Sequence, residues 1–390
     1  MSPFEGELEA VERFRREMPV SSRYAYFDHA AVAPLPQPTR AAIAQWLDEA
    51  TEQGDTQWLR WAETTRRLRT QAAELIGAQT AEIALVPNTT TGLGMVAEGW
   101  PWQEGDNVVT LANEFPSNLY PWMNLASRGV EARLVPVEDG IVDLDRLDDH
   151  IDERTRIVSV SWVGFASGWR LALAEVTALC RRKDVRLMVD AIQGLGVFPI
   201  DVDQLGIDFL AADGHKWLLG PEGAGILYVR RDLQDQMRTI GVGWNSVQAA
   251  HDFSHIELKL RPDATRWEGG STNMAGMIGL QASIDLLQRM GVSKSRSSVA
   301  DQVLSLTDYL CGRLSDVGAQ LISPRHEGHR SGIVTFTPPG HRPPSEVRSH
   351  LLTAGVVVSC RGGGIRVAPH GYNNRDDVER LISGLVECAR

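Results

Sequence analysis

Short apolar runs alternate with longer amphipathic segments between about residues 80 and 230. The apolar runs have the length of buried strands. The segments between them, such as 118–127 and 174–182, place apolar residues near i, i+3 and i+4, as amphipathic helices do. This alternation predicts an α/β domain with a mainly parallel sheet between helices. The expected strands are 83–86, 107–111, 132–137, 157–161, 185–189, 209–212 and 225–229.

The pattern changes on both sides of this region. Residues 39–76 read as mostly helical with a break near Gly54, and 276–290 reads as one helix. Beyond it, helices at 299–314, 345–353 and 375–388 and strands at 333–337, 356–359 and 365–368 indicate a smaller α+β unit. We predict a large α/β domain at 21–290, and a small domain made of 1–20 and 291–390.

The charge balance argues against nucleic-acid and membrane partners. Acidic residues outnumber basic ones, 50 to 39, giving a net charge of −11, whereas both kinds of partner require a basic face. The first residues lack the apolar core of a signal peptide, and no apolar run approaches the ~18 residues of a membrane helix. The four cysteines are scattered, so neither a metal site nor a disulfide framework is expected. We expect a cytoplasmic protein.

Polar segments follow three of the expected strands, at the edge where open α/β sheets bind ligands. Thr89 and Thr90 open a helix, where hydroxyls and backbone N–H groups either bind an anion such as phosphate or cap the helix. Asp190 follows a strand, and a carboxylate there is costly without a cationic partner. Lys216 follows another strand, in the run Asp-Gly-His-Lys-Trp.

Lys216 is the best-placed amine in the chain. Only four lysines occur, and the other three lie in a polar helix end, an Ile-Glu-Leu-Lys-Leu alternation and a serine-rich turn (Lys183, Lys259 and Lys294). The neighbours of Lys216 are His, Trp and leucines, and apolar surroundings lower the pKa of an amine so that it can act as a nucleophile.

These features match pyridoxal 5'-phosphate (PLP). That cofactor requires a lysine for its Schiff base, an acid that keeps its ring nitrogen protonated and a cradle for its phosphate. We therefore predict PLP as cofactor and an amino acid or keto acid as substrate. A nicotinamide-dependent dehydrogenase would also suit an α/β domain, but no G-x-G-x-x-G follows an early strand.

The sequence resembles the class V aminotransferases, the cysteine desulfurase-like branch of the fold-type-I PLP enzymes. The resemblance runs from Tyr-Phe-Asp-His-Ala-Ala at 26–31 to Tyr-Asn-Asn at 372–374, and the Asp-x-x-Gln and Gly-His-Lys motifs carry it. It implies Lys216 as the Schiff-base lysine and Asp190 as the partner of the ring nitrogen. It further implies cofactor contacts from Gln193, His215, Thr89, Thr90 and Phe115.

The same resemblance implies substrate and subunit contacts. Arg366 matches the arginine that binds the substrate carboxylate, for which a bidentate guanidinium is suited, although a structural strand arginine is the alternative. His29 is expected at the substrate. Ser271 matches a residue that reaches the phosphate of a neighbouring subunit, which implies a homodimer with shared sites. Arg170 is either a second anchor for an acidic substrate group or part of a structural ion pair.

Three positions depart from the cysteine desulfurase pattern. Phe115 replaces the histidine that stacks on the cofactor ring, and a phenyl ring cannot transfer protons. Cys360 is followed by Arg-Gly-Gly-Gly, too short for a mobile loop that would carry a reactive cysteine. Asp213 replaces a hydroxyl residue near the phosphate and is expected to point elsewhere or to cap a turn. Sulfur mobilisation is therefore disfavoured.

The remaining reactions share their first steps, and the sequence does not separate them. By family weight we predict an aminotransferase. The alternative is a PLP-dependent lyase or epimerase, of the C–S lyase or cysteine desulfurase, kynureninase or isopenicillin N epimerase type. An alternative from another class is a noncatalytic binding protein that retains the fold.

Overall fold

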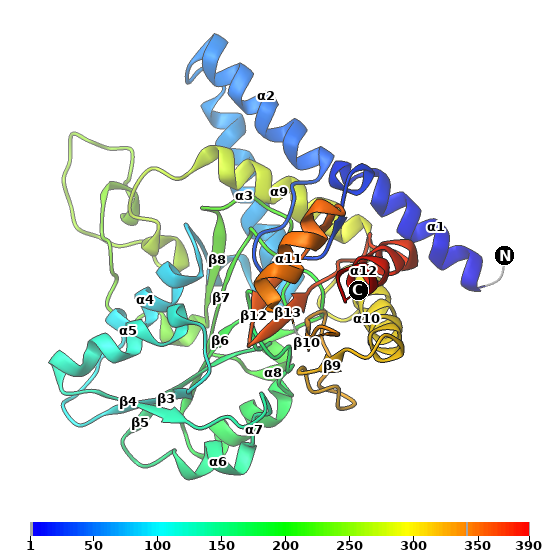
Figure 1. Cartoon of the computed structure of the whole chain (residues 1–390). Coiled ribbons are helices and arrows are strands. Elements are labelled where there is room, and N and C mark those ends of the chain that lie inside the picture. Colours follow the sequence, from blue (N-terminus) through cyan, green and yellow to red (C-terminus); the bar gives the residue numbers. More distant parts are fainter. Residues whose placement is uncertain (1–2, 341, 390) are drawn as a thin grey trace.

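A seven-stranded sheet forms the centre of the computed structural model, which describes residues 3–340 and 342–389. Its spatial order is β2-β8-β7-β6-β5-β3-β4 (Figure 1). Strand β8 runs antiparallel to both of its neighbours, and the other pairs are parallel. The strands are β2 (Ile83–Val86), β3 (Asn107–Leu111), β4 (Glu131–Val135), β5 (Thr155–Ser161), β6 (Arg186–Asp190), β7 (Phe209–Asp213) and β8 (Gly225–Val229).

Both faces of the central strands are buried: successive side chains of a strand point to opposite sides and there join two different apolar cores. In β6, Leu187 and Val189 join one apolar core, whereas Met188 joins another. The first core also contains side chains of α3 and α7, and the second contains side chains of α4. The helices of this region are α2 (Gln37–Gln53), α3 (Trp58–Ile76), α4 (Thr89–Gly99), α5 (Tyr120–Met123), α6 (Leu144–Asp149), α7 (Leu173–Arg182), α8 (Val202–Leu205) and α9 (Met274–Arg289).

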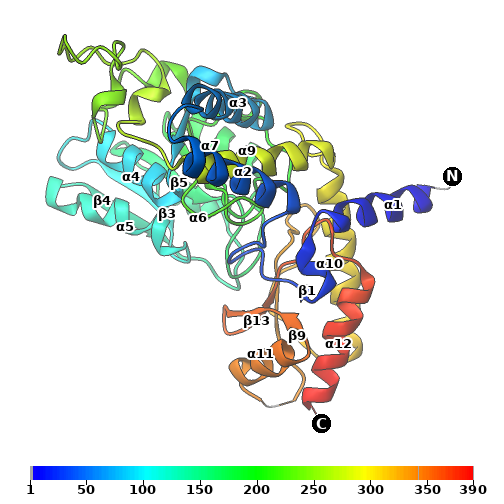
Figure 2. The same cartoon turned by 90° about the horizontal axis from the view of Figure 1, so that it is seen from above.

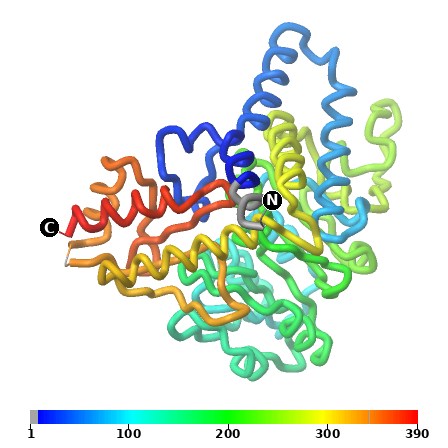
Figure 3. The backbone as a smooth tube through the Cα atoms, turned by 90° about the vertical axis from the view of Figure 1, so that its right-hand side faces the viewer, coloured from blue at the N-terminus to red at the C-terminus, as the bar shows by residue number. Residues whose placement is uncertain are grey.

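A four-stranded antiparallel sheet lies beside the large one, in the order β12-β13-β10-β9. Its own apolar core is shared with helices α10, α11 and α12. In Figure 2 this part stands apart from the rest, and Figure 3 shows α10 and α12 side by side. The elements are β9 (Gln320–Leu321), β10 (Val334–Thr337), β12 (Ser359–Arg361), β13 (Gly364–Val367), α10 (Ser298–Asp316), α11 (Pro344–Thr353) and α12 (Arg375–Ala389).

The predicted α/β class is confirmed, and each expected strand of the large sheet is found within two residues of its predicted bounds. The expected helix at 118–127 is wrong. Pro121 cannot donate a backbone hydrogen bond, and the segment is a 3₁₀ turn, the short helix α5 and a second 3₁₀ turn. Helix α1 (Pro3–Arg16) was not expected.

The boundaries at 21 and 291 stay a prediction. Backbone pairing crosses them: β1 (Ala25–Tyr26) runs parallel to β11 (Val356–Val357), a parallel bridge joins Asp28 to Ala368, and Phe27 lies in the core of the C-terminal part. Within residues 3–340 and 342–389, no helix has both the length and the apolar character that a membrane crossing requires.

Candidate functional site

A pocket of about 390 Å³ opens at the carboxyl ends of the central strands. Side chains from distant parts of the sequence meet there because parallel strands place their carboxyl ends at one edge of a sheet. Eight of the predicted site residues line it: Thr89, Thr90, Phe115, Asp190, Gln193, His215, Lys216 and Arg366.

The Lys216 amine is the buried nucleophile of this pocket. The residue is 8% exposed and follows β7. Burial lowers the pKa of the amine to about 8, although the negative charge of Asp190 acts in the opposite direction. Its Nζ lies 5.6 Å from the centre of the Phe115 ring. At pH 7 roughly a tenth of the amine is therefore neutral, far more than for an ordinary lysine, and the neutral form is the one that acts as a nucleophile or base.

Asp190, the last residue of β6, presents a buried carboxyl to the same pocket. Its Oδ1 accepts a hydrogen bond from the backbone N–H of Ile192, at 3.0 Å. Burial raises the pKa of the carboxyl to about 6, and the hydrogen bond and the Lys216 charge lower it. A cationic group placed against Asp190 would relieve the cost of burying its charge.

Gln193 is fixed by two hydrogen bonds. Its amide group donates to the carbonyl of Ala30 at 3.0 Å, and its carbonyl accepts from the indole N–H of Trp217 at 2.9 Å. Trp217 directly follows Lys216, so its hydrogen bond to Gln193 connects the segment that carries Lys216 with the segment after β6.

The threonines at the start of α4 do not cap that helix. Asn88 is the N-cap, and its side chain accepts from the backbone N–H of Thr91 at 2.8 Å. Thr89 accepts from the backbone N–H of Asp213 at 2.9 Å, and Thr90 donates to the Ser117 hydroxyl at 2.7 Å. Capping by the threonines was the alternative to anion binding, so the geometry favours an anion site at this helix N-terminus.

Asp213 lies in the pocket, contrary to the expectation that it points elsewhere. It is 5% exposed, and its Oδ2 lies 2.9 Å from Nδ1 of His215. The carboxyl of Asp213 and the imidazole of His215 are therefore direct neighbours within the pocket.

The side chain of Arg366 extends from β13 into the pocket, and three of its N–H donors form hydrogen bonds within the protein. It is 2% exposed, and its Nε donates to the Ser359 hydroxyl at 3.1 Å and its Nη1 to the carbonyl of Phe165 at 2.8 Å. Nη2 pairs with Asp28 at 3.3 Å. The guanidinium is thus held rigidly at the pocket. A second arginine, the exposed Arg361, also lines the pocket, and the sequence analysis missed it.

His29 and Arg170 do not line the pocket. His29 is fully buried, with Nδ1 2.7 Å from the Ala368 carbonyl and Nε2 2.9 Å from the Tyr372 hydroxyl. The carbonyl can only accept, so Nδ1 carries the proton and Nε2 accepts from Tyr372. Arg170 donates to the carbonyl of Arg330, and its guanidinium lies 4.6 Å from the centre of the Phe198 ring. Within one chain, both side chains are thus engaged with groups outside the pocket, and their contact with a substrate stays a prediction.

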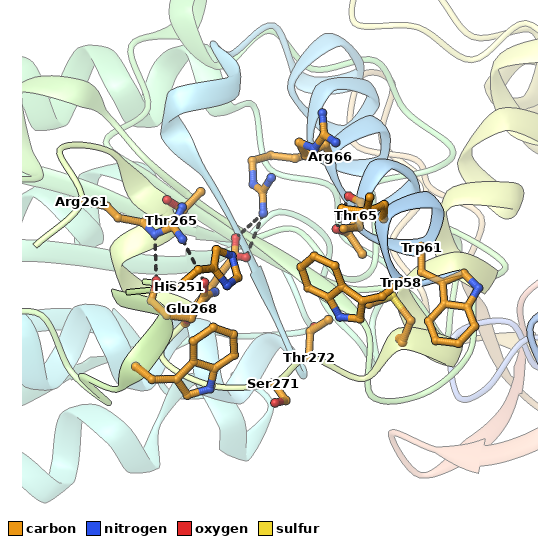
Figure 4. Close-up of a pocket in the computed structure, with 17 residues that line it drawn as sticks. Trp58, Trp61, Thr65, Arg66, His251, Arg261, Thr265, Glu268, Ser271 and Thr272 are labelled. Carbon is orange, nitrogen blue, oxygen red and sulfur yellow. Dashed lines mark hydrogen bonds and ion pairs between the residues drawn. The ribbon is translucent and has the colours of Figure 1, made fainter. Parts of the chain in front are cut away.

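Ser271 lies in a different pocket, of about 530 Å³. Figure 4 shows Ser271 and Thr272 together with Trp58 and Trp61 among the residues that line it. Within one chain, Ser271 therefore does not meet the threonines of the expected phosphate cradle.

Residues 25–381 match the model of the family described as aminotransferase class-V. The chain belongs to the class V aminotransferase family. A probable cysteine desulfurase of Methanothermobacter thermautotrophicus is 30% identical, over 97% of this chain and 98% of the relative. An uncharacterized aminotransferase, YcbU of Bacillus subtilis, is 28% identical over 96% and 97%.

Solved structures agree on the fold. The cysteine desulfurase from Thermococcus onnurineus NA1 has a TM-score of 0.86 and 26% identity, with 97% of this chain and 98% of that chain covered. The cystine C–S lyase C-DES has a TM-score of 0.86 at 24% identity, with 93% and 97% covered. The fold is that of the fold-type-I PLP enzymes, as expected. The named relatives favour the lyase alternative over the aminotransferase that we predicted.

Proposed function

We propose that this chain is a PLP-dependent enzyme that cleaves the C–S bond of a sulfur-containing amino acid by β-elimination. The observation that carries the proposal is the composition of the pocket. The buried amine of Lys216, the buried carboxyl of Asp190 and the hydrogen-bonded guanidinium of Arg366 all line it, and no cysteine is among its lining residues in the described part of the chain. Cysteine desulfurases among its relatives support a sulfur-containing substrate.

The residues of the pocket fit PLP. Lys216 would carry the cofactor, Asp190 would face its ring nitrogen, and the N-terminus of α4 with Thr89 would receive its phosphate. Asp190 makes no hydrogen bond to a cationic group among the described residues, so its carboxyl is available to a positive ring nitrogen. When bound, PLP supplies an electron-accepting ring that stabilises negative charge at the α-carbon of the substrate.

Arg366 and Lys216 would have different roles towards the substrate. The guanidinium of Arg366 would bind the α-carboxylate and so orient the α-carbon. The neutral amine of Lys216 would take the proton from that carbon, for which its lowered pKa is suited. The Cβ–S bond then breaks, and the thiolate leaves with the bonding electrons. Hydrolysis of the released enamine gives pyruvate and ammonia.

Cys360 argues for elimination rather than transfer of sulfur to the protein. It lies in β12, joined to β13 by the two-residue loop Gly362-Gly363. Its neighbour Ser359 contacts Arg366 on the pocket side, whereas Cys360 packs against the core of the C-terminal part. Successive residues of a strand face opposite ways, so the thiol faces away from the pocket.

The products distinguish the reactions. PLP-loaded protein is expected to convert cysteine or cystine into equal amounts of pyruvate and ammonia, with release of sulfide or persulfide, and without an added keto acid. Formation of a new amino acid only when a keto acid is supplied would indicate transamination and contradict the proposal. Sulfur retained on the protein instead of released would indicate a desulfurase.

We further propose a homodimer in which Ser271 contributes to the partner's site. Ser271 shares its pocket with exposed apolar side chains, Leu59 at 78% and Trp244 at 41%, and such surfaces commonly bind another protein. The PLP-loaded protein should sediment as a dimer. Ser271→Ala should weaken cofactor binding, and the variant should still sediment as a dimer. A cofactor-loaded monomer would contradict this role.

A further inference from the structure

Glu114 is a buried carboxyl beside the pocket that the proposed reaction does not use. It is 7% exposed and directly precedes Phe115, which lines the pocket. Its Oε1 accepts from the backbone N–H of Ser161 at 2.6 Å, and its Oε2 contacts the Ser161 hydroxyl. Ser161 ends β5 and pairs in register with Asp190 of β6. Glu114 is therefore linked, through one residue, to the strand position of Asp190.

The turn between Glu114 and Asn118 is tied to β5 at two points. Glu114 holds Ser161, and the side-chain oxygen of Asn118 accepts from the Ser159 hydroxyl at 2.6 Å. Ser159 and Ser161 are two residues apart and so face the same side of the strand. Phe115 is presented to the pocket from between these two anchors. Loss of the Glu114 anchor would free the aromatic ring that faces Lys216.

Glu114 and Asp190 also interact as charges. Burial raises the pKa of Glu114 to about 7, the hydrogen bonds from Ser161 lower it, and the charge of Asp190 raises it further. Burial likewise raises the pKa of Asp190 to about 6, against the effect of Lys216. Among the groups that the structure describes, Asp190 on β6 is the charged group that acts on Glu114, and Lys216 after β7 acts on Asp190.

Glu114 can keep its hydrogen bonds to Ser161 in both protonation states. The ionised carboxyl accepts hydrogen bonds from the hydroxyl and the backbone N–H of Ser161. The protonated carboxyl can donate to the same hydroxyl, because a serine oxygen both donates and accepts. A proton can therefore enter or leave Glu114 without movement of the turn.

We propose that Glu114 is a positioning residue that ties the turn 114–118, which carries Phe115, to β5 and that, by binding or releasing a proton, sets the net charge of the Glu114–Asp190 pair beside the pocket. The role of the pair towards the cofactor rests on the proposed function. The hydrogen bonds between Glu114 and Ser161, and the exchange of a proton at Glu114, do not depend on the cofactor. Ionisation of Glu114 adds one negative charge to the pair as the pH rises, and the absorbance of bound PLP responds to charge near its ring.

Three variants distinguish the effect of the hydrogen bonds of Glu114 from the effect of its ionisation. Glu114→Gln keeps the shape and the hydrogen bonds but cannot ionise, Glu114→Ala removes both, and Glu175→Gln changes an exposed glutamate of α7 as the matched control. The visible absorbance of the PLP-loaded protein is titrated across neutral pH. Wild type and Glu175→Gln should show a step centred near pH 7, which Glu114→Gln should lack. Glu114→Ala should bind PLP about tenfold more weakly because the anchor is lost.

A step that survives unchanged in Glu114→Gln would overturn the proposal. A second measurement does not depend on the cofactor: infrared difference spectra of the protein without PLP, recorded below and above neutral pH. Wild type should lose a carboxylic-acid C=O band that Glu114→Gln never shows, and identical bands in the two proteins would also overturn the proposal. If wild type binds no PLP, the proposed function fails, and the infrared result still decides whether Glu114 exchanges a proton.

Discussion

Lys216→Ala is expected to reduce turnover of amino acids by at least about 10³-fold, because the substitution removes both the attachment point of the cofactor and the base at the α-carbon. Residual PLP held through the helix N-terminus should be released on dialysis. Turnover and the visible absorbance of the dialysed protein measure both effects.

Lys259→Ala is the matched control. Lys259 is exposed, lies outside both pockets and is the same residue type, so its substitution should leave turnover within about twofold of wild type. Turnover in Lys216→Ala comparable to that of the control would contradict the central role of Lys216.

Arg366→Lys should lower kcat/KM for amino acids about 100-fold, equivalent to about 3 kcal/mol, mainly through KM. An ammonium cannot reproduce the planar fork that donates to Ser359, Phe165 and Asp28 and still faces a carboxylate. The substitution also removes the Nη2 donor that contacts Asp28. Steady-state kinetics of the variant and of wild type provide the comparison.

Two comparisons make the Arg366 result specific. Arg296→Lys changes an exposed arginine to the same residue and should leave KM unaltered. The amide of the substrate lacks the carboxylate, so it should be used poorly by wild type and by Arg366→Lys to a similar degree. A variant that discriminates against the amide as strongly as wild type would show that another residue binds the carboxylate.

The sequence was sufficient to predict residues whose position follows from a strand end. Asp190 and Lys216 lie at the carboxyl ends of β6 and β7, and a parallel sheet brings such ends together regardless of their separation in sequence. The strands are themselves predictable because most are short, largely apolar runs between polar segments, such as β2 and β8.

Residues placed by side-chain packing could not be predicted in the same way. The long side chain of Arg170 reaches the Arg330 carbonyl and the Phe198 ring, both far away along the chain, and its neighbours in the sequence indicate neither contact. Arg361 was overlooked because only the β12–β13 hairpin brings it to the pocket. Glu114 is not singled out by the sequence, because its significance comes from hydrogen bonds to β5 that no local pattern reveals.

Borohydride reduction tests the central claim most directly. The protein is loaded with PLP, reduced, digested with a protease and analysed by mass spectrometry, so that the lysine joined to the cofactor is identified. We expect a single labelled peptide, in which Lys216 carries the reduced cofactor. A label on Lys183, Lys259 or Lys294 instead, or a protein that binds PLP without any label, would contradict it.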